Sequence, residues 1–315
     1  MAEFKRELEP SIDRGHLLTE QANPRSVDLD LLETSALVDL FIEEDLRPQQ
    51  AVAGASESLT AAIEAIAERL RHGGRLYYLG AGTSGRLGVL DAAECPPTFC
   101  SAPEQVQGLL AGGAAALLKS SEGLEDQEIA GRADLDEHGF CGQDCLVGIA
   151  AGGTTPYVRG GLAYAKAIGA LAIAMACVPT EQAPLPCDID IRLLTGPEVL
   201  TGSTRLKAGT ATKMALNILS TAVMVRLGKV YGNRMVDVSA SNSKLIDRSI
   251  RILRDLAGVN REAGLELLEQ ANGSVKLALL MAATKLSVHN AQDLLDHHQQ
   301  QLRLALEACG CSLLV

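Results

Sequence analysis

Several features that define common protein classes are missing from this chain of 315 residues. There is no excess of basic residues, because the net charge is −11, so no positive field exists to neutralise the phosphodiesters of a nucleic acid. No apolar run is long enough to span a bilayer, and the charged start of the chain lacks the apolar core of a signal peptide. These absences predict a cytoplasmic protein without a nucleic-acid or membrane partner, in which any anionic ligand needs a local site.

Metal-site and disulfide patterns are also missing. The eight cysteines form no CxxC pair, and the six histidines cluster only at His297-His298, in a polar segment that is more typical of a solvated helix face. We therefore expect reduced thiols and no metal site. With 47% hydrophobic residues, the chain can bury a sizeable core as one large domain or two smaller ones.

The hydrophobic pattern predicts an α/β fold in three parts. Residues 1–47 are polar and acidic and are predicted to be an N-terminal arm with short helices. Apolar residues then follow a helical period up to residue 71, and a second long helix is predicted over 203–227. Alternation of strands with helices over 48–244 favours a parallel sheet covered on both faces. Residues 245–315 are predicted to be all helical, with caps at Asn260 and Ser274. The predicted strands are 75–79, 106–111, 145–150, 169–175 and 188–193.

A glycine-rich loop follows the first predicted strand and precedes a helix. Gly80-x-Gly82-x-x-Gly85 matches the dinucleotide fingerprint, but the second strand ends without the acid that would hold a ribose. Gly-Lys-Ser/Thr is absent as well, which excludes a P-loop. Thr83 and Ser84 place two hydroxyls at the start of a helix, a position that suits a phosphomonoester. A plain tight turn is the alternative, and it is disfavoured because a second loop repeats the chemistry.

That second loop, residues 150–156, again joins an apolar strand to a helix and contains Gly153, Thr154 and Thr155. A third segment, residues 195–210, brings Ser203 and Thr204 together with two basic residues to another helix start. Alone, the third segment fits an ordinary helix cap with solvated basic side chains equally well. Because ligands of open α/β sheets bind at the carboxyl ends of the strands, the three segments together predict a sugar-phosphate site.

Two glutamates are candidate proton carriers. Glu94 precedes Pro96-Pro97, which are expected to stop a helix, so the negative end of the helix dipole would favour its protonated form. Glu125 is predicted at the start of a helix, where the dipole favours the ionised form. Such a pair suits general acid and base roles if both face one site. The alternative is that both are ordinary charges at helix ends.

Long motifs resemble one family. Residues 79–98, which run from the glycine loop through Glu94-Cys95-Pro96-Pro97, closely resemble the N-acetylmuramic acid 6-phosphate etherases. These are sugar isomerase (SIS) domain proteins related to the glucokinase regulatory protein. Residues 196–210 resemble a pattern that both groups share, and further matches cover 19–24 and 236–245. The tail from Gly258 is similar to the family's small UBA-like helical domain, so the resemblance covers essentially the whole chain.

The resemblance implies an activity and roles for the candidate residues. These enzymes remove the D-lactyl ether from C3 of the sugar, giving N-acetylglucosamine 6-phosphate and D-lactate without a metal or redox cofactor. By motif match, Glu94 donates a proton to the departing lactate and Glu125 handles the C2 proton. The phosphate and sugar would be held by Thr83, Ser84, Gly153, Thr154, Thr155, Ser203 and Thr204. A homodimer is implied too, with Lys244 reaching the neighbouring subunit's site.

One position departs from the family pattern, since Gly152 stands where these enzymes usually have serine. The loss of one hydroxyl contact to a charged phosphate costs about 1.5–3 kcal/mol, which predicts weaker phosphate binding with activity retained. Two alternatives to the etherase remain open. A non-catalytic regulator of the glucokinase-regulatory type would carry two SIS domains on a chain about twice as long, and an aldose–ketose isomerase would not explain the full Glu-Cys-Pro-Pro motif.

Overall fold

The computed structural model describes residues 13–119, 123–238 and 243–314. Its centre is a five-stranded parallel sheet in the order β2-β1-β3-β4-β5. All five predicted strands are confirmed, each within two residues of its predicted bounds. The strands are β1 (Leu76–Gly80), β2 (Val106–Leu110), β3 (Cys145–Ile149), β4 (Leu171–Ala176) and β5 (Ile189–Arg192).

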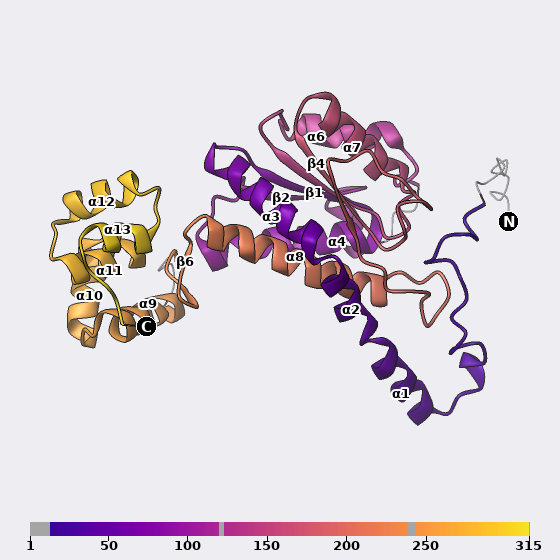
Figure 1. The fold of residues 1–315 in the computed structure, drawn as a ribbon, viewed down its shortest axis with the longest axis horizontal. Helices are drawn as coiled ribbons and strands as arrows, with labels where there is room; N and C mark the ends of the chain where they lie inside the picture. Colours follow the sequence, from indigo (N-terminus) through magenta and orange to yellow (C-terminus); the bar gives the residue numbers. More distant parts are fainter. Residues whose placement is uncertain (1–12, 120–122, 239–242, 315) are drawn as a thin grey trace.

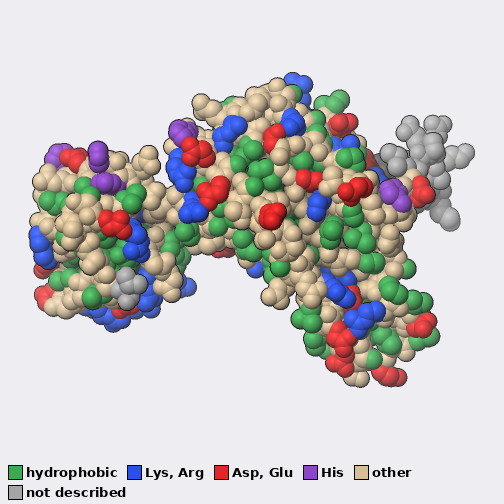
Figure 2. All heavy atoms as spheres, in the orientation of Figure 1, with side chains coloured by type: hydrophobic (Ala, Val, Ile, Leu, Met, Phe, Trp, Pro, Cys, Tyr) green, Lys and Arg blue, Asp and Glu red, His purple; other side chains and the backbone are tan. Residues whose placement is uncertain are grey.

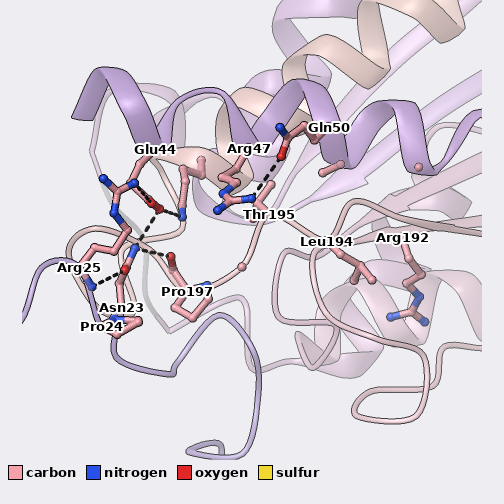
Figure 3. A pocket seen from close by; sticks show the side chains of 14 residues that line it. Asn23, Pro24, Arg25, Glu44, Arg47, Gln50, Arg192, Leu194, Thr195 and Pro197 are labelled. Carbon is pink, nitrogen blue, oxygen red and sulfur yellow. Dashed lines mark hydrogen bonds and ion pairs between the residues drawn. The ribbon is translucent and has the colours of Figure 1, made fainter. Parts of the chain in front are cut away.

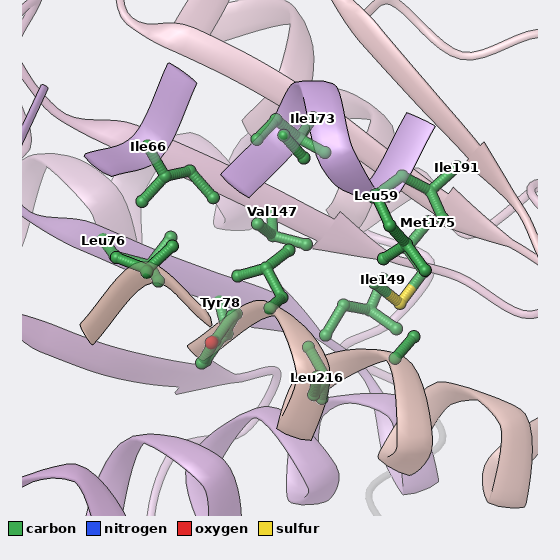
Figure 4. Close-up of a cluster of buried hydrophobic side chains, with 14 of the residues drawn as sticks. Leu59, Ile66, Leu76, Tyr78, Val147, Ile149, Ile173, Met175, Ile191 and Leu216 are labelled. Carbon is green, nitrogen blue, oxygen red and sulfur yellow. The ribbon is translucent and has the colours of Figure 1, made fainter. Parts of the chain in front are cut away.

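Helices cover both faces of the sheet, as predicted (Figure 1). Alternate residues of β1 point to opposite faces: Leu76 and Tyr78 belong to one buried cluster, whereas Tyr77 and Leu79 belong to the other. Figure 4 shows the first cluster, where Ile66 of α3 and Leu216 of α8 pack against the strands. The helices of that face are α2 (Arg47–Gly54), α3 (Ser56–Arg71), α4 (Gly82–Phe99) and α8 (Lys207–Arg226), and α6 (Glu128–Glu137) and α7 (Pro156–Ala167) cover the other.

The prediction that two prolines stop the helix after Glu94 is wrong. Helix α4 runs through Pro96 and Pro97 to Phe99 and ends at Cys100, whose backbone is left-handed with φ 49°. Proline fixes a φ that fits a helix, but inside a helix each proline lacks its own N–H bond and crowds the carbonyl four residues before it. Burial of Phe99 and of Cys95 in the core offsets those missing bonds. Glu94 therefore lies inside the helix and not in its last turn.

Three other helix bounds differ from the predictions. The helix predicted over 48–71 is two helices, because Ala55 has a non-helical backbone conformation and separates α2 from α3. The helix predicted from residue 203 begins at Lys207, since the buried carboxylate of Glu198 accepts hydrogen bonds from the N–H groups of Lys207 and Ala208 at 3.0 and 2.9 Å. Glu125 precedes α6 by three residues and does not start it.

The C-terminal helices have their own hydrophobic core, which also includes Tyr231 and Val236. As predicted, Asn260 and Ser274 cap helices through their side chains. A short hairpin of β6 (Val230–Tyr231) and β7 (Arg234–Met235) joins α8 to this unit. Among the described residues, no helix has the length and apolar character to cross a membrane. The unit contains α9 (Ser243–Ala257), α10 (Arg261–Gln270), α11 (Val275–Thr284), α12 (Val288–His297) and α13 (Leu302–Ala308).

The N-terminal arm contains a 3₁₀ turn (Leu29–Leu31) and α1 (Thr34–Glu44). Helix α1 projects from the sheet domain, and the C-terminal unit lies beyond the opposite end of α8 (Figure 1). One short helix, α5 (Ala115–Leu118), follows β2. The arm and the helical unit therefore flank the sheet domain at opposite ends of α8.

Candidate functional site

The first glycine loop leads directly into α4. A methyl group at Gly80 would lie 2.6 Å from the backbone nitrogen of Gly85, so only glycine permits this turn. The N-cap residue of α4, Ala81, makes no side-chain cap hydrogen bond. Thr83 and Ser84 occupy the first helical turn and are half-buried. Because the free N–H groups and the helix dipole attract anions, this helix start suits a phosphate.

The second loop repeats this arrangement at the end of β3. Gly153 has φ +69°, and a methyl group there would lie 2.7 Å from Cβ of Ala183, so the loop needs glycine at this position. Thr154 and Thr155 are half-buried, and Thr155 is the N-cap of α7 without a side-chain cap hydrogen bond. This loop thus offers two hydroxyls, but the start of α7 is already occupied, because Pro156 has no N–H and the N–H groups of Tyr157 and Val158 donate to the carbonyl oxygens of Glu125 and Thr155.

The third segment differs from the prediction, because its helix start is already occupied. Glu198 caps α8 internally, and burial raises the pKa of this carboxyl. Ser203 and Thr204 lie in the turn just before α8. A methyl group at Gly209 would lie 3.4 Å from the carbonyl oxygen of Thr204 and 3.5 Å from Cγ2 of Thr83. The third segment therefore lies beside the first loop, with Gly209 of α8 close to both Thr204 and Thr83, but it offers no free helix end.

Residues 17–24 of the arm cross over the second and third segments, which the sequence prediction missed. Leu17 packs with Val178 and Ala183, and the N–H of Leu18 donates to Oε1 of Gln182 at 2.9 Å. A methyl group at Gly152 would lie 3.6 Å from Oγ1 of Thr19. The only sequence signal for this contact was the family match at 19–24.

The two glutamates lie at different distances from the loops. The carbonyl oxygen of Glu125 accepts a hydrogen bond of 3.0 Å from the N–H of Tyr157, which places Glu125 beside the second loop. Glu94 is exposed on α4, eleven residues after Thr83. Eleven residues make three helical turns, so Glu94 and Thr83 share a helix face at an axial separation of about 16 Å.

A buried network fixes the turn of α4 that precedes Glu94. Asp91 accepts hydrogen bonds from the hydroxyls of Tyr78 at 2.9 Å and Ser220 at 3.1 Å, which tie α4 to β1 and α8. Burial raises the pKa of Asp91, although both hydrogen bonds work to lower it. The helix that carries Glu94 is thus held rigidly against the sheet.

Lys244 is not brought to the other candidate residues. It is exposed in the first turn of α9, beyond the C-terminal end of α8, whereas Ser203 and Thr204 precede the N-terminal end. A helix of 20 residues is about 30 Å long. Within one chain, Lys244 is therefore too far from these hydroxyls to share a ligand with them.

A pocket of about 510 Å³ lies between the N-terminal arm and Lys207, the first residue of α8 (Figure 3). Lys207 and Glu44 form a buried ion pair there, and Asn23 and Arg25 turn toward the same carboxylate. Burial works against ionisation of Glu44, but hydrogen bonds from Lys207, Asn23 and Arg25 lower its pKa. No predicted site residue lines this pocket, whose charged groups are mostly paired with one another, so it anchors the arm to α8.

Comparisons with known proteins agree with the resemblance in the motifs. Residues 49–166 match the model of the glucokinase regulatory protein N-terminal SIS domain. The chain is 76% identical to an N-acetylmuramic acid 6-phosphate etherase of Synechococcus sp. over 99% of both chains. It is 60% identical to one of Nostoc punctiforme over 93% of this chain and 96% of that protein. A solved phosphoheptose isomerase from Neisseria gonorrhoeae is 17% identical, with TM-score 0.42, over 61% of this chain and 98% of that one.

Proposed function

Because this chain belongs to the N-acetylmuramic acid 6-phosphate etherase family, we propose that it cleaves the D-lactyl ether of N-acetylmuramic acid 6-phosphate. The products are N-acetylglucosamine 6-phosphate and D-lactate, so the protein is a carbon–oxygen lyase. The observation that carries this proposal is the 76% identity over 99% of both chains with an etherase. The wider role is cytoplasmic recycling of the amino sugars of peptidoglycan.

The phosphate binds at the first two loops. The uncapped start of α4 supplies N–H groups, and the hydroxyls of Thr83 and Ser84 add donors. In the second loop, the turn at Gly153 presents the hydroxyls of Thr154 and Thr155 as a second set of donors just before α7. Ser203 and Thr204 contact the sugar, a role supported by the closeness of Thr204 to Thr83.

The chemistry is an elimination followed by an addition. In the open-chain sugar, the C1 aldehyde acidifies the C2 proton, and the carboxylate of Glu125 removes it. The C3–O bond breaks as Glu94 gives a proton to the departing lactate oxygen, which leaves a C2–C3 double bond. Water then adds at C3 and a proton returns to C2. The position of Glu125 beside the second loop supports its role, and the match of residues 79–98 to the etherase motif supports that of Glu94.

The active form is a homodimer in which the partner's Lys244 completes the site. The separation of about 30 Å along α8 supports this role, because the same chain's Lys244 does not reach its own Ser203 and Thr204. A lysine near the sugar would stabilise the developing negative charge of the enolate after C2 deprotonation.

Turnover in ¹⁸O- and deuterium-labelled water tests the proposed reaction. We expect release of D-lactate, one solvent oxygen at C3 and solvent hydrogen at C2 of the product. The Glu94→Gln variant should bind the substrate and release no lactate, and Glu104→Gln, a carboxylate outside the site, is the matched control. Lactate release without oxygen label at C3 would contradict the mechanism. Tight binding without any lactate release would instead favour a regulator of the glucokinase-regulatory type.

A further inference from the structure

The arm segment from Leu17 to Asn23 is held in place at both of its ends. Leu17 is 1% exposed and packs with Val178, next to the second loop. At the other end, the side-chain amide of Asn23 donates to the carboxylate of Glu44 at 2.9 Å and to the carbonyl oxygen of Pro197 at 3.2 Å (Figure 3). The residues between these two anchors therefore have a fixed path beside the candidate site.

Glu20 extends from this segment over the turn that contains the candidate sugar contacts Ser203 and Thr204. A methyl group at Gly202 would lie 3.2 Å from Oε2 of Glu20. Because Gly202 has no side chain, the carboxylate comes close to the backbone of this turn. Glu20 is exposed, and its carboxylate forms no hydrogen bond or ion pair with another residue in the described ranges. Its oxygen atoms are therefore available to a ligand at this turn.

Thr19, the preceding residue, faces the second loop. It is fully buried, and its Oγ1 has no hydrogen-bond partner within the described part of the chain. A methyl group at Gly152 would lie 3.6 Å from that oxygen. A buried hydroxyl without a partner costs free energy and is rare in folded proteins. The arm thus touches the site at two places, and at one of them it holds a polar atom that the chain alone does not satisfy.

The groups around the site differ in what they can bind. The N–H groups at the start of α4 and the hydroxyls of the first two loops donate hydrogen bonds, which suits a phosphate. The carboxylate of Glu20 only accepts hydrogen bonds, so it suits hydroxyl and amide N–H groups and repels an anion. On the face shown in Figure 2, acidic and basic side chains are interspersed among the residues drawn in colour. Selectivity for a sugar phosphate therefore depends on local groups such as these.

We propose that Glu20 is a specificity-determining residue of this site, whose carboxylate accepts hydrogen bonds from hydroxyl or amide N–H groups of the sugar. The proposal rests on the function proposed above, because it concerns the same site and substrate. It also sets the direction of the ligand. The phosphate lies at the first two loops, and the uncharged end of the sugar lies beside Glu20 and the turn before α8. The reverse direction would place the phosphate against a carboxylate, which like charges oppose.

Calorimetric binding to the full-length Glu20→Ala variant tests this role with two probes, N-acetylglucosamine 6-phosphate and inorganic phosphate. We expect the dissociation constant of the sugar phosphate to rise about 10- to 100-fold, because a charged acceptor is lost. The dissociation constant of inorganic phosphate should stay the same or fall, since this probe occupies only the loops and no longer meets a negative charge nearby. Glu33→Ala, which removes an exposed carboxylate just before α1, is the matched control and should change neither constant.

Two results would overturn the proposal. If Glu20→Ala weakens both probes equally, Glu20 acts through the structure of the loops and not through the sugar. If the dissociation constant of the sugar phosphate is unchanged, the carboxylate is a solvated surface charge. The thermal midpoint should match that of the wild-type chain, because the carboxylate of Glu20 is exposed and unpaired within the described residues.

Turnover separates this proposal from the proposed function. With N-acetylmuramic acid 6-phosphate, Glu20→Ala should raise KM by about 10- to 100-fold and leave kcat nearly constant, because the lost contact holds the sugar in the ground state and the transition state alike. A fall in kcat at constant KM would contradict a role in binding. If the wild-type chain releases no D-lactate while Glu20→Ala still weakens only the sugar phosphate, the etherase function fails and the role of Glu20 stands. Release of D-lactate with equal KM values refutes the role of Glu20 alone.

Discussion

Gly152→Ser is the most direct test of the second loop as a phosphate site. The backbone at this position suits a non-glycine residue, because its φ is not positive. A methyl group there would lie 3.6 Å from Oγ1 of Thr19, 3.8 Å from Cδ1 of Leu17 and 3.9 Å from Oγ1 of Thr154. All three are ordinary van der Waals distances, so serine fits without displacing the loop.

The added hydroxyl should strengthen substrate binding. A neutral donor to a charged phosphate contributes about 1.5–3 kcal/mol, which corresponds to a fall in KM of about 10- to 150-fold. The phosphate does not react, so the gain applies equally to the ground state and the transition state, and kcat should stay constant. Steady-state release of D-lactate measures both constants. Gly152→Ala is the control, since it adds the volume without the hydroxyl.

A competing partner for this hydroxyl is visible in the structure. Oγ1 of Thr19 is buried and has no hydrogen-bond partner among the described residues. If the serine bonds Thr19 instead of the phosphate, Gly152→Ser gains about 1 kcal/mol of stability with no change in KM. Equal KM values for the serine and alanine variants would therefore refute the assignment of the loop position to phosphate binding.

Three further changes concern the scaffold of the site. Gly160→Ala should lower the free energy of unfolding by at least about 3 kcal/mol in urea denaturation, because its methyl group would lie 2.0 Å from a backbone oxygen of α6. Lys207→Met should lower it by about 3 kcal/mol, since Glu44 then stays buried without its closest cation. Asp144 has a lowered pKa, because its hydrogen bonds with Arg75 and the N–H of Cys141 outweigh burial. Its contribution to the free energy of unfolding is fully present above the unfolded pKa of about 3.9 and is lost as pH falls further. The free energy of unfolding of Asp144→Asn should therefore fall less steeply at acidic pH than that of the wild-type chain.

Each scaffold change has a result that would contradict it. Gly54→Ala is the control for Gly160→Ala, because nothing lies within 4 Å of its added methyl group, and equal stabilities would show that α6 and α7 separate freely. An unchanged free energy of unfolding for Lys207→Met would mean that Arg25 and Asn23 alone compensate the buried charge of Glu44. The same pH dependence of the free energy of unfolding for Asp144→Asn and wild type at acidic pH would show that this carboxyl keeps its pairing in the unfolded chain.

The sheet and its loops were predictable because their signals are local. Each strand is an apolar run, and each loop contains glycines that its backbone requires, such as Gly80 and Gly153. Contacts between distant segments leave no such signal. The cap of α8 by Glu198 and the crossing of Thr19 over Gly152 depend on where the fold brings residues together. They were therefore missed.

The continuation of α4 past Pro96 changes the physical basis for Glu94. The sequence predicts Glu94 at a helix end, where the dipole would act on it, but that end lies at Phe99, more than a turn further on. What the structure offers instead is spacing. Three turns separate Thr83 from Glu94 on one face, about 16 Å of axial rise, and side chains of a helix lean toward its N-terminus. The carboxyl thus leans back toward the phosphate loop along the face that it shares with Thr83. In our proposal, this lean and the Asp91 network, rather than the dipole, direct Glu94 toward the sugar.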